Sequence, residues 1–145
     1  MQISVGTVLA NGSLVINTGS STSKKILVID DDPSVSEGLL DLLNSMGFVA
    51  ETFQRADEFL QSGRADSTSC LIADVQMPGM TGIELYDVLI NADNMIPTIL
   101  ITAFPNDRDR TLALHSGVTC YLVKPFNDDD LHECIRSALG ARVAG

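Results

Sequence analysis

Five short apolar runs, each followed by a segment with a helical pattern, constrain the fold of this chain more than any other feature. Continuous apolar runs bounded by turn signals are typical of buried parallel strands. Their alternation with helical patterns predicts a parallel sheet with helices on both faces, which is a doubly wound α/β fold. The predicted strands cover residues 25–29, 48–53, 70–73, 97–102 and 119–123, and the predicted helices cover 33–46, 56–62, 82–91, 107–116 and 128–139.

Turn and cap residues indicate where several of these helices begin and end. Asp32 precedes Pro33, and a proline at the first helical position with an aspartate before it predicts that Asp32 is the N-cap. Asn127 is expected to cap the last helix, whose first turn is acidic, as the helix dipole favours. Gly47 is expected to end the helix that Asp32 caps, and Gly117 the helix over 107–116, because glycine is the usual residue just past a helix end.

The chain divides into a short amino-terminal segment, one domain and a short tail. Residues 24–140 are long enough to form a single domain with its own core, and residues 141–145 form the tail. Within residues 1–23, Asn11 and Gly12 lie between apolar runs, which predicts a β-hairpin, and a Gly/Ser/Thr linker follows. A native hairpin and an added expression segment are both open readings of this part.

Composition excludes several classes of protein. Apolar residues make up 45% of the chain and charged residues 19%, a compact globular composition. The net charge of −10 argues against direct nucleic-acid binding, which needs a basic face. No apolar run approaches membrane-spanning length and no charged-then-apolar signal peptide opens the chain. The three cysteines, Cys70, Cys120 and Cys134, are odd in number and lack metal-ligand spacing, so we expect them to be reduced core residues of a cytoplasmic protein.

Polar side chains stand where four of the predicted strands end. Asp30 and Asp31 follow the first strand, Asp74 the third, Thr102 the fourth and Lys124 the fifth. In a parallel sheet these ends share one edge, where ligands bind. Carboxylates about 4 Å apart repel by roughly 1 kcal/mol in water and about 4 kcal/mol at an effective dielectric of 20, so the cluster needs a cation or a proton. Hard oxygen ligands in a partly open site favour Mg²⁺, and the set suits a phosphoryl group.

The same residues, in the same order, carry a resemblance to a known family. From Lys24 to about Leu139 the chain resembles the receiver domain of two-component response regulators, most nearly the nitrogen-fixation-regulator type, which is often joined to a helix-turn-helix output domain. We expect no output domain within this chain. The resemblance implies a flavodoxin-like receiver fold with sheet order 2-1-3-4-5. Its motifs are Val28-Ile29-Asp30-Asp31-Asp32, Asp74 with Met77-Pro78-Gly79-Met80-Thr81-Gly82, Ile101-Thr102-Ala103, and Lys124-Pro125-Phe126.

The resemblance also implies which residues carry out phosphoryl transfer. Asp74 would accept a phosphoryl group from a sensor histidine kinase. Asp31 and Asp74, with the backbone carbonyl of Gln76, would hold Mg²⁺, and Asp30 would act through a water molecule. Gln76 and Phe104 fall at positions that vary in the family and tune the phosphoryl lifetime, so this lifetime stays open.

Further roles implied by the resemblance belong to the switch. Lys124 would pair with the phosphoryl oxygens, and Thr102 would close on them. Tyr121 falls where the family has its rotating aromatic side chain, which is expected to turn inward on phosphorylation. A cis peptide bond is implied before Pro125. The chain is therefore expected to be a self-phosphorylating acceptor with slow autodephosphorylation, not an enzyme that turns over an external substrate.

Partner and function alternatives follow from this reading. The output is expected to pass to a downstream protein, or to a second copy of the chain, through residues 104–126 and the last helix. One alternative is a phosphohydrolase of the haloacid-dehalogenase type, because residues 30–34 superficially offer its Asp-x-Asp start. However, Pro33 suits a helix start, and no later paired-acid motif follows. Another alternative is an interaction module that is never phosphorylated.

Overall fold

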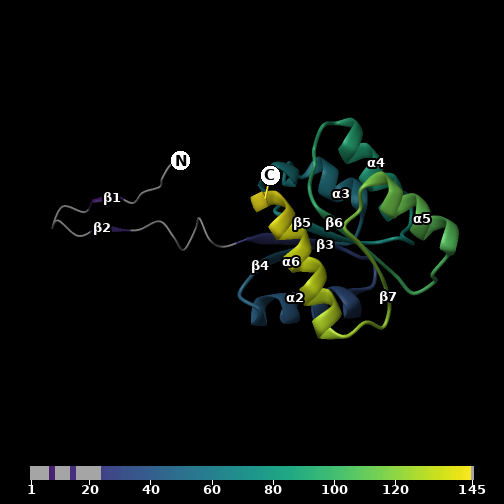
Figure 1. The fold of residues 1–145 in the computed structure, drawn as a ribbon, viewed down its shortest axis with the longest axis horizontal. Coiled ribbons are helices and arrows are strands. Elements are labelled where there is room, and N and C mark those ends of the chain that lie inside the picture. Colours follow the sequence, from purple (N-terminus) through teal and green to yellow (C-terminus); the bar gives the residue numbers. More distant parts are fainter. Residues whose placement is uncertain (1–6, 9–13, 16–23, 145) are drawn as a thin grey trace.

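The computed structural model describes residues 7–8, 14–15 and 24–144, and its centre is a five-stranded parallel sheet (Figure 1). The order across the sheet is β4-β3-β5-β6-β7, which confirms the predicted order 2-1-3-4-5. The three central strands are buried along most or all of their length. Their bounds are Lys25–Ile29 for β3, Val49–Phe53 for β4, Cys70–Asp74 for β5, Thr98–Thr102 for β6 and Cys120–Val123 for β7.

Helices cover both faces of the sheet, as the alternating pattern predicts. Helices α3, α4 and α5 lie on one side of the sheet and α2 and α6 on the other (Figure 1). Side chains of the first group pack in one core cluster with Leu27 and Leu100, and those of the second group pack in another cluster with Val28 and Ile101. Alternate residues of the strands therefore supply the two clusters. The helices are α2 (Pro33–Ser45), α3 (Ala56–Gln61), α4 (Gly82–Asn91), α5 (Asp107–Ser116) and α6 (Asp128–Ala144), with a 3₁₀ turn at Ala65–Ser67.

The predicted caps form the hydrogen bonds expected of them. The Asp32 carboxylate accepts the backbone N–H of Ser34 at 2.9 Å, and the side chain of Asn127 accepts that of Asp130 at 2.7 Å. Gly117 ends α5 with a left-handed φ of 115°. Helix α6 continues through residue 144, so it includes most of the segment predicted as a tail.

A short antiparallel pair lies near the amino terminus. Strand β1 (Thr7–Val8) pairs with β2 (Leu14–Val15), and Thr7 stands opposite Val15. This pairing agrees with the predicted hairpin. The Asn11-Gly12 turn and the linker before residue 24 lie outside the described residues.

The cysteine prediction is wrong for two of the three residues. Cys120, at the start of β7, and Cys134, in α6, form a disulfide with their Cα atoms 6.0 Å apart. Both face the core cluster beneath α2 and α6, so the packing of α6 on the sheet brings them together although 14 positions separate them in sequence. Cys70 is buried in the same cluster.

Helix α4 begins in close contact with the end of β5, and Gly82 permits this approach. A Cβ atom at residue 82 would lie 2.5 Å from the carbonyl oxygen of Asp74 and 3.1 Å from Leu100 Cδ2. The Gly82 N–H also donates to the carbonyl of Val75 at 3.1 Å. The loop that follows Asp74 is therefore held at both of its ends.

Because of this contact, we expect Gly82→Ala to destabilise the domain by about 1–3 kcal/mol, as overpacking against fixed backbone does. The matched control is Gly38→Ala in α2, where a Cβ atom would meet nothing within 4 Å. It should stabilise the domain by about 0.5–1 kcal/mol, because alanine favours a helix interior. Urea unfolding of both variants measures the two effects, and equal stabilities would contradict the close approach at residue 82.

Candidate phosphoryl-transfer site

The ends of β3, β5 and β7 bring one lysine and two buried carboxylates together. Lys124 Nζ lies 3.0 Å from Asp30 Oδ2 and 3.5 Å from Asp74 Oδ2. Asp30 is fully buried and Asp74 is 6% exposed. The sequence prediction that these three strand ends meet at one edge is therefore confirmed.

Asp31 forms an acidic cluster with Asp30 and Asp74. One carboxylate oxygen from each of Asp30, Asp31 and Asp74 lies within 4.8 Å of the other two. Asp30 already uses both of its oxygens, since Oδ1 accepts the Asp32 N–H at 2.9 Å and Oδ2 accepts from Lys124. In contrast, no described residue donates a hydrogen bond to the buried Asp74 Oδ1. An orphaned carboxylate oxygen beside an exposed Asp31 fits a hard divalent cation such as Mg²⁺.

Burial and neighbouring charges shift the pKa values of Asp74 and Lys124. Burial, together with the negative charge of Asp30, raises the pKa of Asp74 to about 6, and Lys124 opposes this rise only in part. Burial alone would lower the pKa of Lys124. The hydrogen bond to Asp30 and the charges of both carboxylates outweigh burial, so the pKa of Lys124 is raised. Lys124 therefore remains charged while Asp74 is poised to exchange a proton or bind a cation.

Thr102 ends β6 as predicted, and its hydroxyl makes two hydrogen bonds. The fully buried side chain donates to Gln76 Oε1 at 2.6 Å and accepts the Phe104 N–H at 3.0 Å. The sequence analysis gave Gln76 a backbone-carbonyl role toward Mg²⁺ and a position that tunes the phosphoryl lifetime, but it did not predict this contact between its side chain and Thr102. Its position two residues after Asp74 is the only sequence signal that could have suggested this contact.

Ser36 is a second residue that sequence reasoning missed. Its buried hydroxyl donates to the backbone carbonyl of Asp30 at 3.1 Å, which fixes the turn between β3 and α2. A serine inside a helical pattern gave no signal of this contact, because the acceptor lies six residues back, in the loop before the helix.

Tyr121 points into the core in this structure. Only 8% of the residue is exposed, and it packs in the cluster beneath α3, α4 and α5. Burial raises the pKa of its phenol. The sequence prediction places the inward position after phosphorylation, whereas the inward position is already adopted here alongside the Thr102–Gln76 hydrogen bond.

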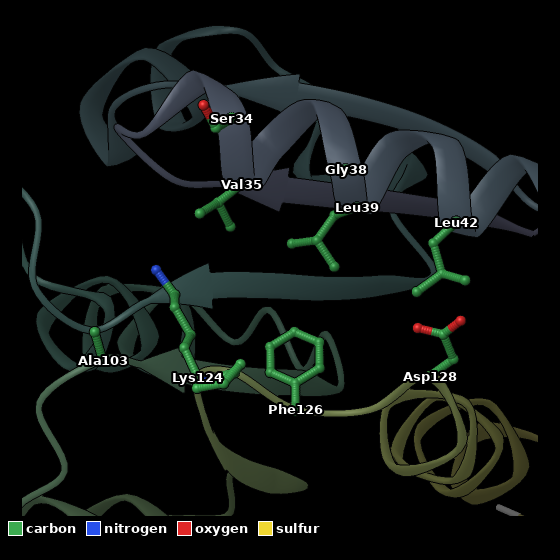
Figure 2. Close-up of a pocket in the computed structure, with 10 residues that line it drawn as sticks. Ser34, Val35, Gly38, Leu39, Leu42, Ala103, Lys124, Phe126 and Asp128 are labelled. Carbon is green, nitrogen blue, oxygen red and sulfur yellow. The ribbon is translucent and has the colours of Figure 1, made fainter.

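An apolar groove of about 540 Å³ opens beside Lys124, between α2 and the segment that follows β7 (Figure 2). The Lys124–Pro125 peptide bond is cis, as the resemblance implies. Figure 2 shows Val35 and Leu39 of α2 facing Phe126 across the groove.

None of the described helices is long and apolar enough to cross a membrane.

Comparisons with known proteins agree with this geometry. The family model described as "Response regulator receiver domain" matches residues 26–136. Nodulation protein W of Bradyrhizobium diazoefficiens is 34% identical over 122 residues, which are 84% of this chain and 54% of that protein. The transcriptional regulatory protein FixJ of the same organism is 35% identical over 119 residues, 82% of this chain and 58% of that protein. This chain thus spans little more than half the length of these curated relatives.

Solved structures give the same result. The response regulator StyR superposes with a TM-score of 0.78 and 38% identity, over 84% of this chain and 62% of that one. FixJ-N superposes with a TM-score of 0.74 and 29% identity, over 81% of this chain and 94% of that one. Because the family model covers residues 26–136, which are most of the chain, this chain belongs to the response regulator receiver domain family.

Proposed function

We propose that Asp74 is the phosphoacceptor of a two-component phosphorelay. The observation that carries the proposal is a buried Asp74 Oδ1 that no described residue hydrogen-bonds, beside the ammonium of Lys124. An Asp74 oxygen forms a bond to the phosphorus of a phosphohistidine, the N–P bond breaks, and the imidazole nitrogen keeps the electron pair. Nucleophilic attack requires the ionised carboxylate. Neither alternative raised by the sequence gains support from the fold or from the relatives described.

A divalent cation fits the acidic cluster. Asp31, Asp74 and the backbone carbonyl of Gln76 would hold Mg²⁺, and Asp30 would act through water, since both of its oxygens are engaged. Mg²⁺, when bound, neutralises charge on the transferring phosphoryl oxygens. Lys124 would bind the same oxygens, and Thr102 would donate a hydrogen bond to them. Hydrolysis of the acyl phosphate would be slow, as expected for an acceptor that does not turn over an external substrate.

A sensor histidine kinase is the proposed phosphodonor, and the reaction would take place in the cytoplasm. The groove between α2 and Phe126 would seat the kinase helix that carries the phosphohistidine, because Lys124 lines both this groove and the site at Asp74. Val35, Leu39 and Phe126 line the groove (Figure 2). The donor's phosphoryl group would meet Mg²⁺ at the acidic cluster next to Lys124.

The output would leave through residues 104–126 with α6, a surface that shares Lys124, Phe126 and Asp128 with the groove. Phe104 is 71% exposed and Leu112 50%, and the exposed side chains of Leu114 and Val123 belong to the same segment. Exposed apolar side chains in one region are typical of protein–protein contact. A downstream protein or a second copy would bind here. The net charge of −10 opposes direct contact with nucleic acid.

The first test is phosphorylation by a small donor. Wild type incubated with acetyl phosphate and Mg²⁺ should gain one phosphoryl group, whereas Asp74→Asn should gain none. Asp32→Asn is the charge-matched control, because Asp32 is exposed and only caps α2, and it should be labelled like wild type. Intact mass spectrometry reads the adduct, and labelling of Asp74→Asn would overturn the assignment.

The metal proposal predicts a difference between neighbouring aspartates. Asp31→Asn should weaken Mg²⁺ binding by about 10-fold or more, since it removes an anionic oxygen ligand. Asp32→Asn should leave the affinity unchanged, because asparagine caps a helix about as well as aspartate. Isothermal titration with Mg²⁺ compares the two variants, and the reverse order would place the ligand one residue later.

The raised pKa of Asp74 predicts a pH-dependent stability in metal-free protein. The folded state holds the Asp74 proton more tightly than the unfolded chain, so the resulting stability is present below the unfolded pKa of 3.8 and is lost as pH rises through about 6. Asp74→Asn avoids this loss. It should be more stable than wild type by roughly 1–2 kcal/mol near pH 8, with the gap closing toward about pH 4.

Urea unfolding across this pH range in chelator measures the gap. Asp41→Asn, at an exposed position of α2, is the control and should follow wild type at each pH within about 0.5 kcal/mol. A gap between Asp74→Asn and wild type that does not depend on pH would contradict the raised pKa.

A further inference from the structure

We propose that the side chain of Gln76 is a latch, a positioning residue that holds the Thr102 hydroxyl until Asp74 is phosphorylated. The proposal rests on the proposed function, in which Asp74 is the acceptor and Thr102 donates to the phosphoryl group. Its basis is the 2.6 Å hydrogen bond from Thr102 Oγ1 to Gln76 Oε1. The latch acts through the side-chain amide and is separate from the backbone carbonyl assigned to Mg²⁺.

The Thr102 hydroxyl has only one hydrogen to donate. In this structure that hydrogen is directed to Gln76, and the oxygen accepts the Phe104 N–H at 3.0 Å. A hydroxyl that is fully buried needs such a partner. To donate to a phosphoryl oxygen, Thr102 must first release Gln76. A charge-assisted hydrogen bond replaces a neutral one in that exchange, and this difference favours the phosphorylated arrangement.

The backbone around Gln76 is fixed, so the latch depends on its side chain. The Val75 N–H donates to the carbonyl of Ile101 at 2.8 Å, and the Val75 carbonyl accepts the Gly82 N–H. Met77 on the other side is 8% exposed and belongs to the core. Gln76 itself is exposed. The amide of Gln76 can therefore turn to solvent without disturbing the neighbouring backbone. A water molecule can then donate to Gln76 Oε1 in place of Thr102.

Release of the latch also reaches the proposed output surface. The Phe104 N–H ends on the Thr102 hydroxyl, so rotation of Thr102 breaks that bond. Phe104 is 71% exposed and begins the segment 104–126. The inward position of Tyr121 is already taken, so the hydrogen bonds of Thr102 are the part of the switch that is left to change.

Beryllofluoride with Mg²⁺, a phosphoryl mimic, tests the latch by equilibrium titration. Gln76→Met keeps the side-chain length and removes the acceptor, so that the Thr102 hydroxyl hydrogen loses its acceptor only in the unliganded protein. Beryllofluoride should therefore bind about 2- to 10-fold more tightly, the equivalent of one net hydrogen bond. Gln61→Met makes the same chemical change at an exposed position of α3 and should bind like wild type.

A double-mutant cycle with Thr102→Val separates the latch from any direct effect of residue 76 on the mimic. In the Thr102→Val background, Gln76→Met should give no tightening. Equal or weaker binding by Gln76→Met, or the same tightening in both backgrounds, would overturn the latch. Wild type that binds no beryllofluoride, or Asp74→Asn that binds it equally, would instead overturn the proposed function.

A second readout needs no phosphoryl mimic. In unliganded protein, freeing Thr102 should loosen its bond to the Phe104 N–H, so amide exchange at Phe104 should be about 2- to 10-fold faster in Gln76→Met than in wild type or Gln61→Met. Unchanged exchange at Phe104 would mean that the Gln76 side chain does not hold Thr102, and it would overturn the latch independently of Asp74 chemistry.

Discussion

The contact between one lysine and two buried carboxylates sets the conditions for the rest of this structure. Lys124 lies within 3.5 Å of both Asp30 and Asp74, and both acids are almost completely removed from water. Removing Lys124 from this set would leave two buried carboxylates without a counter-charge, which is strongly destabilising. The contact requires the ends of β3, β5 and β7 to lie along one edge, and the parallel sheet order supplies that arrangement. Within the described residues, the same contact leaves Asp74 Oδ1 buried without a hydrogen-bond donor.

Much of the fold and the residue types of the site could be predicted from the sequence, because their signals are local. Apolar runs with turn residues gave the strands, and the caps at Asp32 and Asn127 placed two helix starts that the structure confirms. The strand-end residues Asp74, Thr102 and Lys124 then followed from the sheet, since parallel strands end at a common edge. The sheet order itself came from the family resemblance, because periodicity does not determine how strands are arranged.

Contacts that depend on rotamers or on long-range packing could not be predicted in this way. The Thr102–Gln76 bond joins side chains 26 positions apart, and a glutamine in a loop gives no sign of its acceptor. The inward position of Tyr121 depends on its side-chain rotamer and on its packing in the core, which the local sequence pattern does not specify. The cysteines were read from compartment and spacing, whereas the packing of α6 on the sheet decides which of them meet.

The disulfide between Cys120 and Cys134 has a consequence for the unfolded chain as well as for the folded one. The bond closes a ring that contains Lys124, the cis Lys124–Pro125 bond and the cap residue Asn127. In the chain-entropy description, closing about 15 residues removes roughly 3 kcal/mol of freedom from the denatured ensemble. When the disulfide is formed, the segment that carries Lys124 samples far fewer conformations in the unfolded chain. The disulfide therefore restricts the conformational search of the residue that supplies the ammonium group to Asp30 and Asp74.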